Sequence, residues 1–120
     1  MTDSLQIILI ADDLMLGSTV SGHAAAHKVP FANVSTENAA AACEESSRLL
    51  VLLDLETAGL DVSTLAKSLP NSALQTAVAY GPHVHTDRLK EAAQAGFGHV
   101  VSRGHFSAQI GRIIADFANS

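Results

Sequence analysis

The sequence has little of several residue types, and each shortage argues against a class of protein. One cysteine, Cys43, cannot form a disulfide within the chain, and such a composition fits a reducing cytoplasm. Tryptophan is absent and aromatic residues make up 4% of the chain, which argues against a stacking platform for single-stranded nucleic acid. The seven lysine and arginine residues are scattered and the net charge is −5, so we expect no direct binding of nucleic acid.

Long hydrophobic runs are also missing. The longest, Leu5–Ala11 and Leu49–Leu53, fall far short of the ~18 residues that span a bilayer. The N-terminus has no basic region ahead of an apolar one, so it does not read as a secretory signal. Hydrophobic residues nevertheless make up 48% of the 120 residues, enough for one folded core. We therefore expect a single cytoplasmic domain over residues 1–120, with no membrane association.

Short apolar runs alternate with segments of helical spacing. Continuous or β-rich runs predict strands at Leu5–Ala11, Phe31–Val34, Leu49–Leu53, Ala77–Tyr80 and His99–Ser102. Helices are predicted between and after them: around Leu16–His27, from Ser35 or Thr36 to about Ser47, over Val62–Leu69 with Pro70 as its stop, from Thr86 or Asp87 to Gly96, and around Ile110–Phe117.

This alternation predicts an α/β fold of the doubly wound type. It would have a five-stranded parallel sheet, with helices on both faces and right-handed crossovers. For five strands the common order is 2-1-3-4-5, which puts the first and third strands side by side. Their C-terminal ends then open onto one crevice, where ligands bind in such sheets.

Three aspartates follow those two strands. Asp12 and Asp13 come just after the first strand, and Asp54 comes just after the third. Three carboxylates in one crevice repel each other unless a hard cation such as Mg²⁺ or a proton offsets their charge. A carboxylate beside Mg²⁺ can act as a nucleophile towards a phosphoryl group. The alternative is a purely structural role, in which these aspartates stabilise turns or cap helices.

Three stretches, taken in order, resemble the receiver domains of bacterial response regulators. Ile-Leu-Ile-Ala-Asp12-Asp13 is similar to their first strand and acidic pair, and Val-Leu-Leu-Asp54-Leu-Glu56 is similar to their phospho-acceptor strand. Leu89-Lys-Glu-Ala-Ala-Gln-Ala-Gly96 is similar to their fourth helix. The resemblance covers nearly the whole chain and implies a CheY-like domain of a two-component phosphorelay. It implies Asp54 as phospho-acceptor, and Asp12, Asp13, Asp54 and the main-chain carbonyl of Glu56 as ligands of Mg²⁺.

The chain departs from this family where phosphorylation is sensed and relayed. Gly81 stands where the family has a threonine or serine, so no hydroxyl is available to bond a phosphoryl oxygen. Arg103 replaces the usual lysine, and a planar guanidinium is not equivalent to an ammonium group. Gly104 replaces a proline, and Val100 replaces the switch aromatic residue. We therefore expect atypical or absent switching, because a switch needs different contacts in its two states.

The resemblance implies a regulatory domain rather than an enzyme, with a sensor histidine kinase or another signalling protein as partner. It also implies a homodimer through the face of the fourth and fifth helices as one arrangement. One alternative is a pseudo-receiver that acts only as a protein-interaction module. A second is a small Mg²⁺-dependent phosphohydrolase with Asp54 as nucleophile, although the chain is short for the extra strands and cap of that class. A third, a flavodoxin-like binder of a small ligand, is disfavoured by the acidic loops.

Three histidines allow one further hypothesis. His83 and His85 are predicted on the loop after the fourth strand, and His105 on the loop after the fifth, at the same edge as the carboxylates. The pair His83 and His85, with Asp54 or His105, could hold Zn²⁺ or another transition metal. The spacing favours the simpler interpretation, that they are histidines on surface loops.

Overall fold

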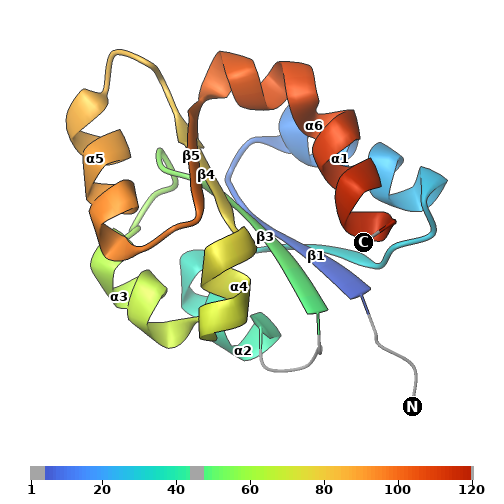
Figure 1. Cartoon of the computed structure of the whole chain (residues 1–120), viewed down its shortest axis with the longest axis horizontal. Helices are drawn as coiled ribbons and strands as arrows, with labels where there is room; N and C mark the ends of the chain where they lie inside the picture. The colour runs from blue at the N-terminus through green and yellow to red at the C-terminus, as the bar shows by residue number, and fades with distance from the viewer. Residues whose placement is uncertain (1–4, 44–47, 120) are drawn as a thin grey trace.

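The computed structural model describes residues 5–43 and 48–119, and its centre is one parallel sheet of five strands (Figure 1). The strands are β1 (Leu5–Ile10), β2 (Phe31–Val34), β3 (Arg48–Asp54), β4 (Val78–Gly81) and β5 (His99–Ser102). Their order is β2-β1-β3-β4-β5 and every neighbouring pair is parallel. The predicted doubly wound sheet is therefore confirmed, with β1 and β3 adjacent at its centre.

Helices cover both faces of the sheet (Figure 1). They are α1 (Leu14–Ala26), the short 3₁₀ helix η1 (Thr36–Asn38), α2 (Ala39–Cys43), α3 (Val62–Ser68), α4 (Asn71–Thr76), α5 (Thr86–Ala95) and α6 (Arg103–Ala118). Buried side chains of α1 and α6 pack on one face, whereas those of α2, α3, α4 and α5 pack on the other. Within the described part of the chain, no helix is both long and apolar enough to cross a membrane.

The alternation of side chains along β3 explains the two-sided core. Leu50 and Leu52 point towards α1 and α6, while Val51 and Leu53 point towards the opposite helices. A strand buried on both faces needs apolar residues at every position, which is what the run Leu49–Leu53 supplies. Fully burying one such leucine side chain stabilises the fold by about 1.5–3 kcal/mol.

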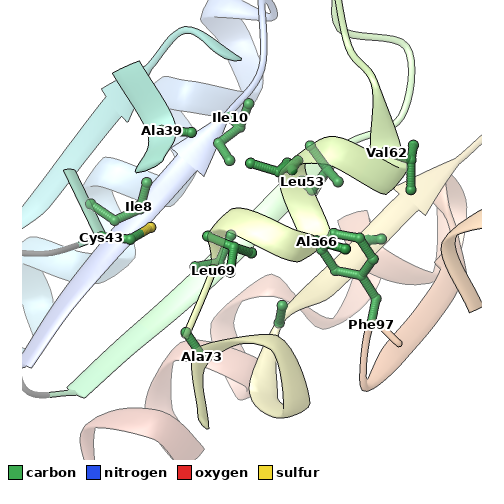
Figure 2. Close-up of a cluster of buried hydrophobic side chains, with 14 of the residues drawn as sticks. Ile8, Ile10, Ala39, Cys43, Leu53, Val62, Ala66, Leu69, Ala73 and Phe97 are labelled. Carbon is green, nitrogen blue, oxygen red and sulfur yellow. The ribbon is translucent and has the colours of Figure 1, made fainter. Parts of the chain in front are cut away.

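The core on the α2–α5 face combines strand residues with small residues from the helices (Figure 2). Ile8, Ile10 and Leu53 from β1 and β3 meet Ala39 and Cys43 of α2. Residues of α3 and α4, and Phe97 between α5 and β5, complete this cluster. Cys43 is 2% exposed, so it packs in the core as a small hydrophobic residue.

The region around Pro70 differs from the prediction. Pro70 does end α3, but a further short helix, α4, begins at once at Asn71. The carbonyl of Pro70 accepts a hydrogen bond from Leu74 N at 2.9 Å, so the proline opens this helix. Proline suits a helix start because its missing N–H would have no partner within the helix there.

The helix ends agree with the predictions only in part. Ser35 stands at the cap of η1 without a side-chain capping bond, and the predicted end near Ser47 lies outside the described residues. His85, rather than Thr86 or Asp87, occupies the N-cap of α5, again without a side-chain bond. Gly96 is confirmed as the C-cap, with a left-handed φ of 104° that favours glycine.

Candidate functional site

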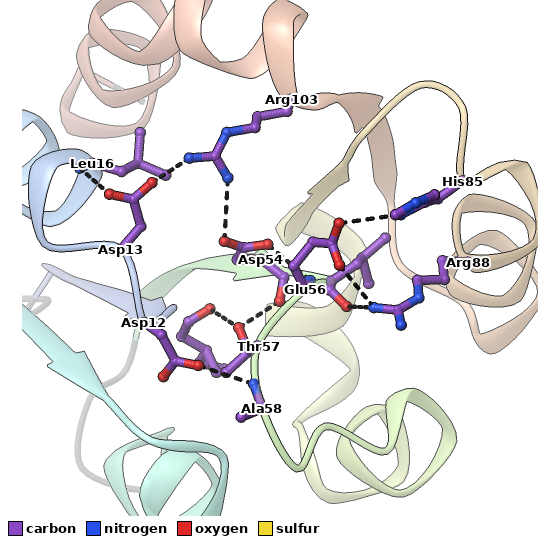
Figure 3. A network of polar contacts seen from close by, with 12 residues as sticks. Asp12, Asp13, Leu16, Asp54, Glu56, Thr57, Ala58, His85, Arg88 and Arg103 are labelled. Carbon is purple, nitrogen blue, oxygen red and sulfur yellow. Dashed lines mark hydrogen bonds and ion pairs between the residues drawn. The ribbon is translucent and has the colours of Figure 1, made fainter.

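The C-terminal edge of the sheet brings the predicted acidic residues to one region (Figure 3). β1 and β3 run in register, with Ile10 opposite Leu53, so the chain leaves both strands at the same level. Asp12 and Asp13 follow β1 by two and three residues, and Asp54 is the last residue of β3. The shared edge predicted from the strand order is thus observed.

Asp13 has two roles at this edge. One oxygen, Oδ1, accepts a hydrogen bond from Leu16 N at 3.1 Å and so caps α1. The other oxygen, Oδ2, pairs with Nη2 of Arg103. The Leu16 N–H, followed by the Arg103 side chain, lowers the pKa of Asp13 below its usual value. Asp13 is therefore held as a carboxylate, with Oδ2 directed towards the Arg103 guanidinium.

Asp54 is buried, with 4% of its surface exposed. Its Oδ1 accepts a hydrogen bond from Glu56 N at 2.8 Å, and its Oδ2 lies 3.6 Å from Nη1 of Arg103. Loss of hydration raises the pKa of Asp54, while the Glu56 N–H and the charge of Arg103 act against that increase. The carboxylate thus depends on a backbone donor and one guanidinium for its stabilisation.

Arg103 joins Asp13 to Asp54 from the first position of α6. Ser102 ends β5 and caps the helix, since its Oγ accepts a hydrogen bond from His105 N at 3.1 Å. This direct passage from strand to helix leaves no loop between β5 and α6. The arginine side chain therefore starts at the sheet edge and reaches across to the end of β1 and the end of β3 (Figure 3).

Asp12 points elsewhere. Its Oδ2 accepts a hydrogen bond from Ala58 N at 3.0 Å, so it holds the segment after β3 rather than joining Asp13 and Asp54. Among residues 5–43 and 48–119, no three acidic, histidine or cysteine side chains are grouped so as to hold a metal ion. Asp13 and Asp54 are the acidic pair that shares a cation, and that cation is Arg103.

Glu56 forms a second polar cluster beside the first. Its Oε1 lies 3.1 Å from Nδ1 of His85, and its Oε2 lies 3.2 Å from Nη1 of Arg88. The same Nη1 donates to the carbonyl of Leu55 at 2.8 Å. This cluster ties the segment after β3 to the start of α5. It was not predicted, because Arg88 and Glu56 are 32 residues apart and neither lies in a recognisable motif.

Thr57 is another site residue that the sequence did not reveal. It is 7% exposed, and its Oγ1 donates towards the carbonyls of Ile10 at 3.2 Å and Asp54 at 2.5 Å. One hydroxyl hydrogen serves one acceptor at a time, so these are alternative bonds. The bond to Ile10 links the segment after β3 to the end of β1, and the bond to Asp54 turns that segment back on the end of β3.

Gly81 and Val100, two positions that depart from the receiver pattern, both lie within the described fold. Gly81 is buried at the end of β4 and, being a glycine, brings no side chain to the site; a Cβ there would meet the Leu55 side chain at 3.4 Å. Val100 is partly buried against the core on the α2–α5 face. Tyr80 is opposite Asp54 in register and stacks on Phe106, with 4.0 Å between ring centroids.

The histidines do not form the hypothesised metal group within the described residues. His83 and His85 precede α5, as expected, and His85 contacts Glu56. The placement of His105 on a loop was wrong, because Ser102 starts α6 directly and His105 lies in its first turn. The third histidine is thereby built into a helix instead of a movable loop.

Comparison with solved structures supports this fold independently. The receiver domain of a sensor histidine kinase from Pseudomonas aeruginosa, solved with a magnesium ion in its active-site cleft, has a TM-score of 0.74 at 15% identity and covers 98% of this chain and 99% of its own. A Francisella response-regulator receiver domain has a TM-score of 0.72 at 11% identity, over 95% of this chain and 96% of its own. CheY4 of Vibrio cholerae has a TM-score of 0.70 at 9% identity, over 92% of this chain and 98% of its own.

No family model matches the sequence, and no curated protein matches it at a significant level. The similarity is thus one of structure at low sequence identity. The chain has the CheY-like fold of response-regulator receiver domains, as the resemblance implied.

Proposed function

We propose that this chain is a receiver-like signal-transduction domain of a two-component phosphorelay, with Asp54 as phospho-acceptor and with atypical switching. The observation that carries the proposal is the guanidinium of Arg103 shared between Asp13 and Asp54. It provides positive charge beside the oxygen of Asp54 that would become bonded to phosphorus. Phosphoryl transfer needs such charge because the transferred group is anionic throughout.

The proposed reaction uses one oxygen of Asp54. Oδ1 is occupied by the Glu56 N–H, which leaves Oδ2, on the side of Arg103, as the nucleophile. Oδ2 attacks phosphorus in a phosphorylated histidine of a sensor kinase or in a small acyl phosphate. An O–P bond forms, the donor's bond to phosphorus breaks, and its electron pair leaves with the donor. The domain takes up one phosphoryl group and so acts as a regulatory acceptor rather than as an enzyme.

Mg²⁺ belongs to the same proposal. Asp13 and Asp54, with Asp12 and the main-chain carbonyl of Glu56, would hold it, and when bound it would neutralise charge on the phosphoryl oxygens. All these donors are hard oxygens, and Asp13 and Asp54 already share one cationic group. The guanidinium competes for the same two carboxylates, so binding of Mg²⁺ is expected to be weak.

Atypical switching follows from the residues around Asp54. Gly81 carries no hydroxyl that could move towards a phosphoryl oxygen, and Val100 carries no ring that could change its position in response. Arg103 remains as the group whose contacts would change most. The proposed output is therefore a change at the start of α6, read by a cytoplasmic signalling partner or by a second copy through the face formed by α5 and α6.

A pseudo-receiver is the second candidate function, and the same arginine favours it. If the guanidinium stays on Asp13 and Asp54, the acidic pair is satisfied without phosphate and the domain acts through its surface alone. The two candidates differ in whether Asp54 reacts, which can be measured directly.

The test is phosphorylation by acetyl phosphate with Mg²⁺, followed by intact mass. The proposed function predicts an added mass of one phosphoryl group, which Asp54→Asn abolishes. Asp87→Asn, which alters an exposed carboxylate in the first turn of α5, is the matched control and should keep the added mass. Absence of the adduct from the unmodified chain, together with no NMR response to beryllofluoride, would exclude the phospho-acceptor and leave the pseudo-receiver. An adduct that survives Asp54→Asn would place the acceptor elsewhere.

A further inference from the structure

A largely apolar groove lies on the α6 face of the sheet, and its lining runs along α6 from His105 to Phe117. It encloses about 750 Å³. Leu50, Val78 and Val101, from three adjacent strands, line it, and Ile113 and Phe117 of α6 line it from the helix side. It shares no lining residue with the acidic pair or with the Glu56 cluster.

The offset between strands explains why this groove exists. β4 begins at Val78, which is opposite Leu52, so in the described chain the first residues of β3 have no strand beside them on that edge. α4 lies there instead, where Thr76 Oγ1 donates to the carbonyl of Leu49 at 3.4 Å. Ala73 of α4 packs into the core of the other sheet face. Leu50 of β3 therefore lines the groove together with residues of α6.

Among residues 5–43 and 48–119, two arginines and one carboxylate line the groove, although the chain is acidic overall. Arg48 and Arg112 line it, with Asp116 as its carboxylate. Arg112 Nε lies 3.9 Å from Asp116 Oδ2, and both side chains are more than three-quarters exposed, so this pair is weak. The Arg48 guanidinium stands over the Phe117 ring, 5.7 Å from its centroid. Both arginines thus lie near the C-terminal part of α6, at one end of an apolar surface.

We propose that this groove binds a medium-chain carboxylic acid. The apolar tail would lie over Leu50, Val78 and Val101, and the carboxylate would be held at the end marked by Arg48 and Arg112. The volume is in the range of small-molecule sites, which are mostly apolar with a few polar groups that fix orientation. This site is independent of the proposed function, since its ligand does not touch Asp54.

The test is an NMR titration of the isotope-labelled chain with decanoate below its critical micelle concentration. The proposal predicts saturable shifts at Val78, Val101 and Ile113. Decanol, which has the same tail without the charge, should bind at least about tenfold more weakly, and acetate should not bind. Equal binding of decanol would remove the role of the arginines. Absence of saturable shifts, or shifts confined to the acidic edge, would overturn the proposal.

Two variants and one control separate the head-group end from the tail. Arg112→Gln should weaken decanoate several-fold without changing the melting temperature, because Arg112 is exposed. Ser72→Trp, at an exposed α4 position that lines the groove, should block the ligand by filling its space. Lys90→Gln removes the same charge from exposed α5 and should leave affinity unchanged. If Lys90→Gln weakens binding as much as Arg112→Gln, the effect is one of net charge and the site is not as proposed.

Discussion

Replacing Arg103 by glutamine removes the cation that joins Asp13 to Asp54 and leaves a shorter, uncharged polar side chain. The variant leaves Asp54, which is 4% exposed, with the Glu56 N–H as the remaining hydrogen-bond donor to its carboxylate among residues 5–43 and 48–119. We expect the folded state to lose stability at neutral pH, because a buried carboxylate then lacks its counter-charge.

The size of the loss can be bounded from the geometry. Two unit charges 3.6 Å apart, the separation of Arg103 Nη1 and Asp54 Oδ2, attract by about 5 kcal/mol at an effective dielectric constant of ~20. The Arg103 side chain is 43% exposed, so solvent screening and the cost of desolvation cancel much of this. A net loss of about 1–3 kcal/mol is expected, which lowers the melting temperature by roughly 4–12 °C for a domain of this size.

The pH dependence has a defined sign. The pKa of Asp54 is raised by burial, and loss of Arg103 raises it further. A carboxyl with a raised folded-state pKa binds its proton more readily in the folded state, so the loss of stability is full above that pKa and declines as pH falls through it. The pKa of Asp13 is lowered partly by Arg103, and the stability that this provides above its unfolded value is also lost in the variant.

Thermal unfolding between pH 4 and pH 7.5 is the assay, with Arg112→Gln as the matched control on the same helix. The control removes an exposed pair and should change stability by no more than about 0.5 kcal/mol. A melting temperature of Arg103→Gln within one degree of the unmodified chain at pH 7 would refute the reasoning, since it would mean that the bridge is not formed or not needed. So would a deficit that is equally large at both ends of the pH range.

Three further predictions concern packing around single residues and can be measured by urea unfolding. Gly98→Ala should lower the free energy of unfolding by roughly 2–4 kcal/mol, because a Cβ there would lie 1.7 Å from the carbonyl oxygen of Gln75. Gly104→Ala, whose Cβ would have nothing within 4 Å, should leave the free energy of unfolding unchanged or raise it by up to about 1 kcal/mol. Similar values for the two variants would contradict the close approach at Gly98. Tyr80→Phe should raise stability by about 1 kcal/mol, since Tyr80 Oη is buried without a hydrogen-bond partner among the described residues, and a loss instead would reveal a partner such as water. Gly81→Ser should change stability by less than about 1 kcal/mol, because its Cβ would make ordinary contact with Leu55, and it should increase the NMR response to beryllofluoride if a hydroxyl is what the site lacks.

Most of the architecture could be predicted from local patterns. Short runs that are apolar or rich in β-forming residues, separated by segments of helical spacing, predicted the strands. For Phe31–Val34 and His99–Ser102 the predicted bounds are the observed ones. The order of elements then predicted the sheet, because right-handed crossovers leave few topologies for such a chain. The short helix after Pro70 was missed, since a proline after a helical run is read as a stop and six residues carry too little periodicity to show a new start.

The sequence by itself determined that Asp12, Asp13 and Asp54 would lie at one edge, because hydrophobic periodicity and strand order act through the chain's own local preferences. Only the tertiary structure decided how they are used: Asp13 and Asp54 share Arg103, which is 90 residues from Asp13, while Asp12 turns to Ala58. The same holds for the groove beside α6, which depends on where β4 begins relative to β3. Side-chain pairing and strand offset depend on distances between segments far apart in the chain, and no local pattern encodes those distances.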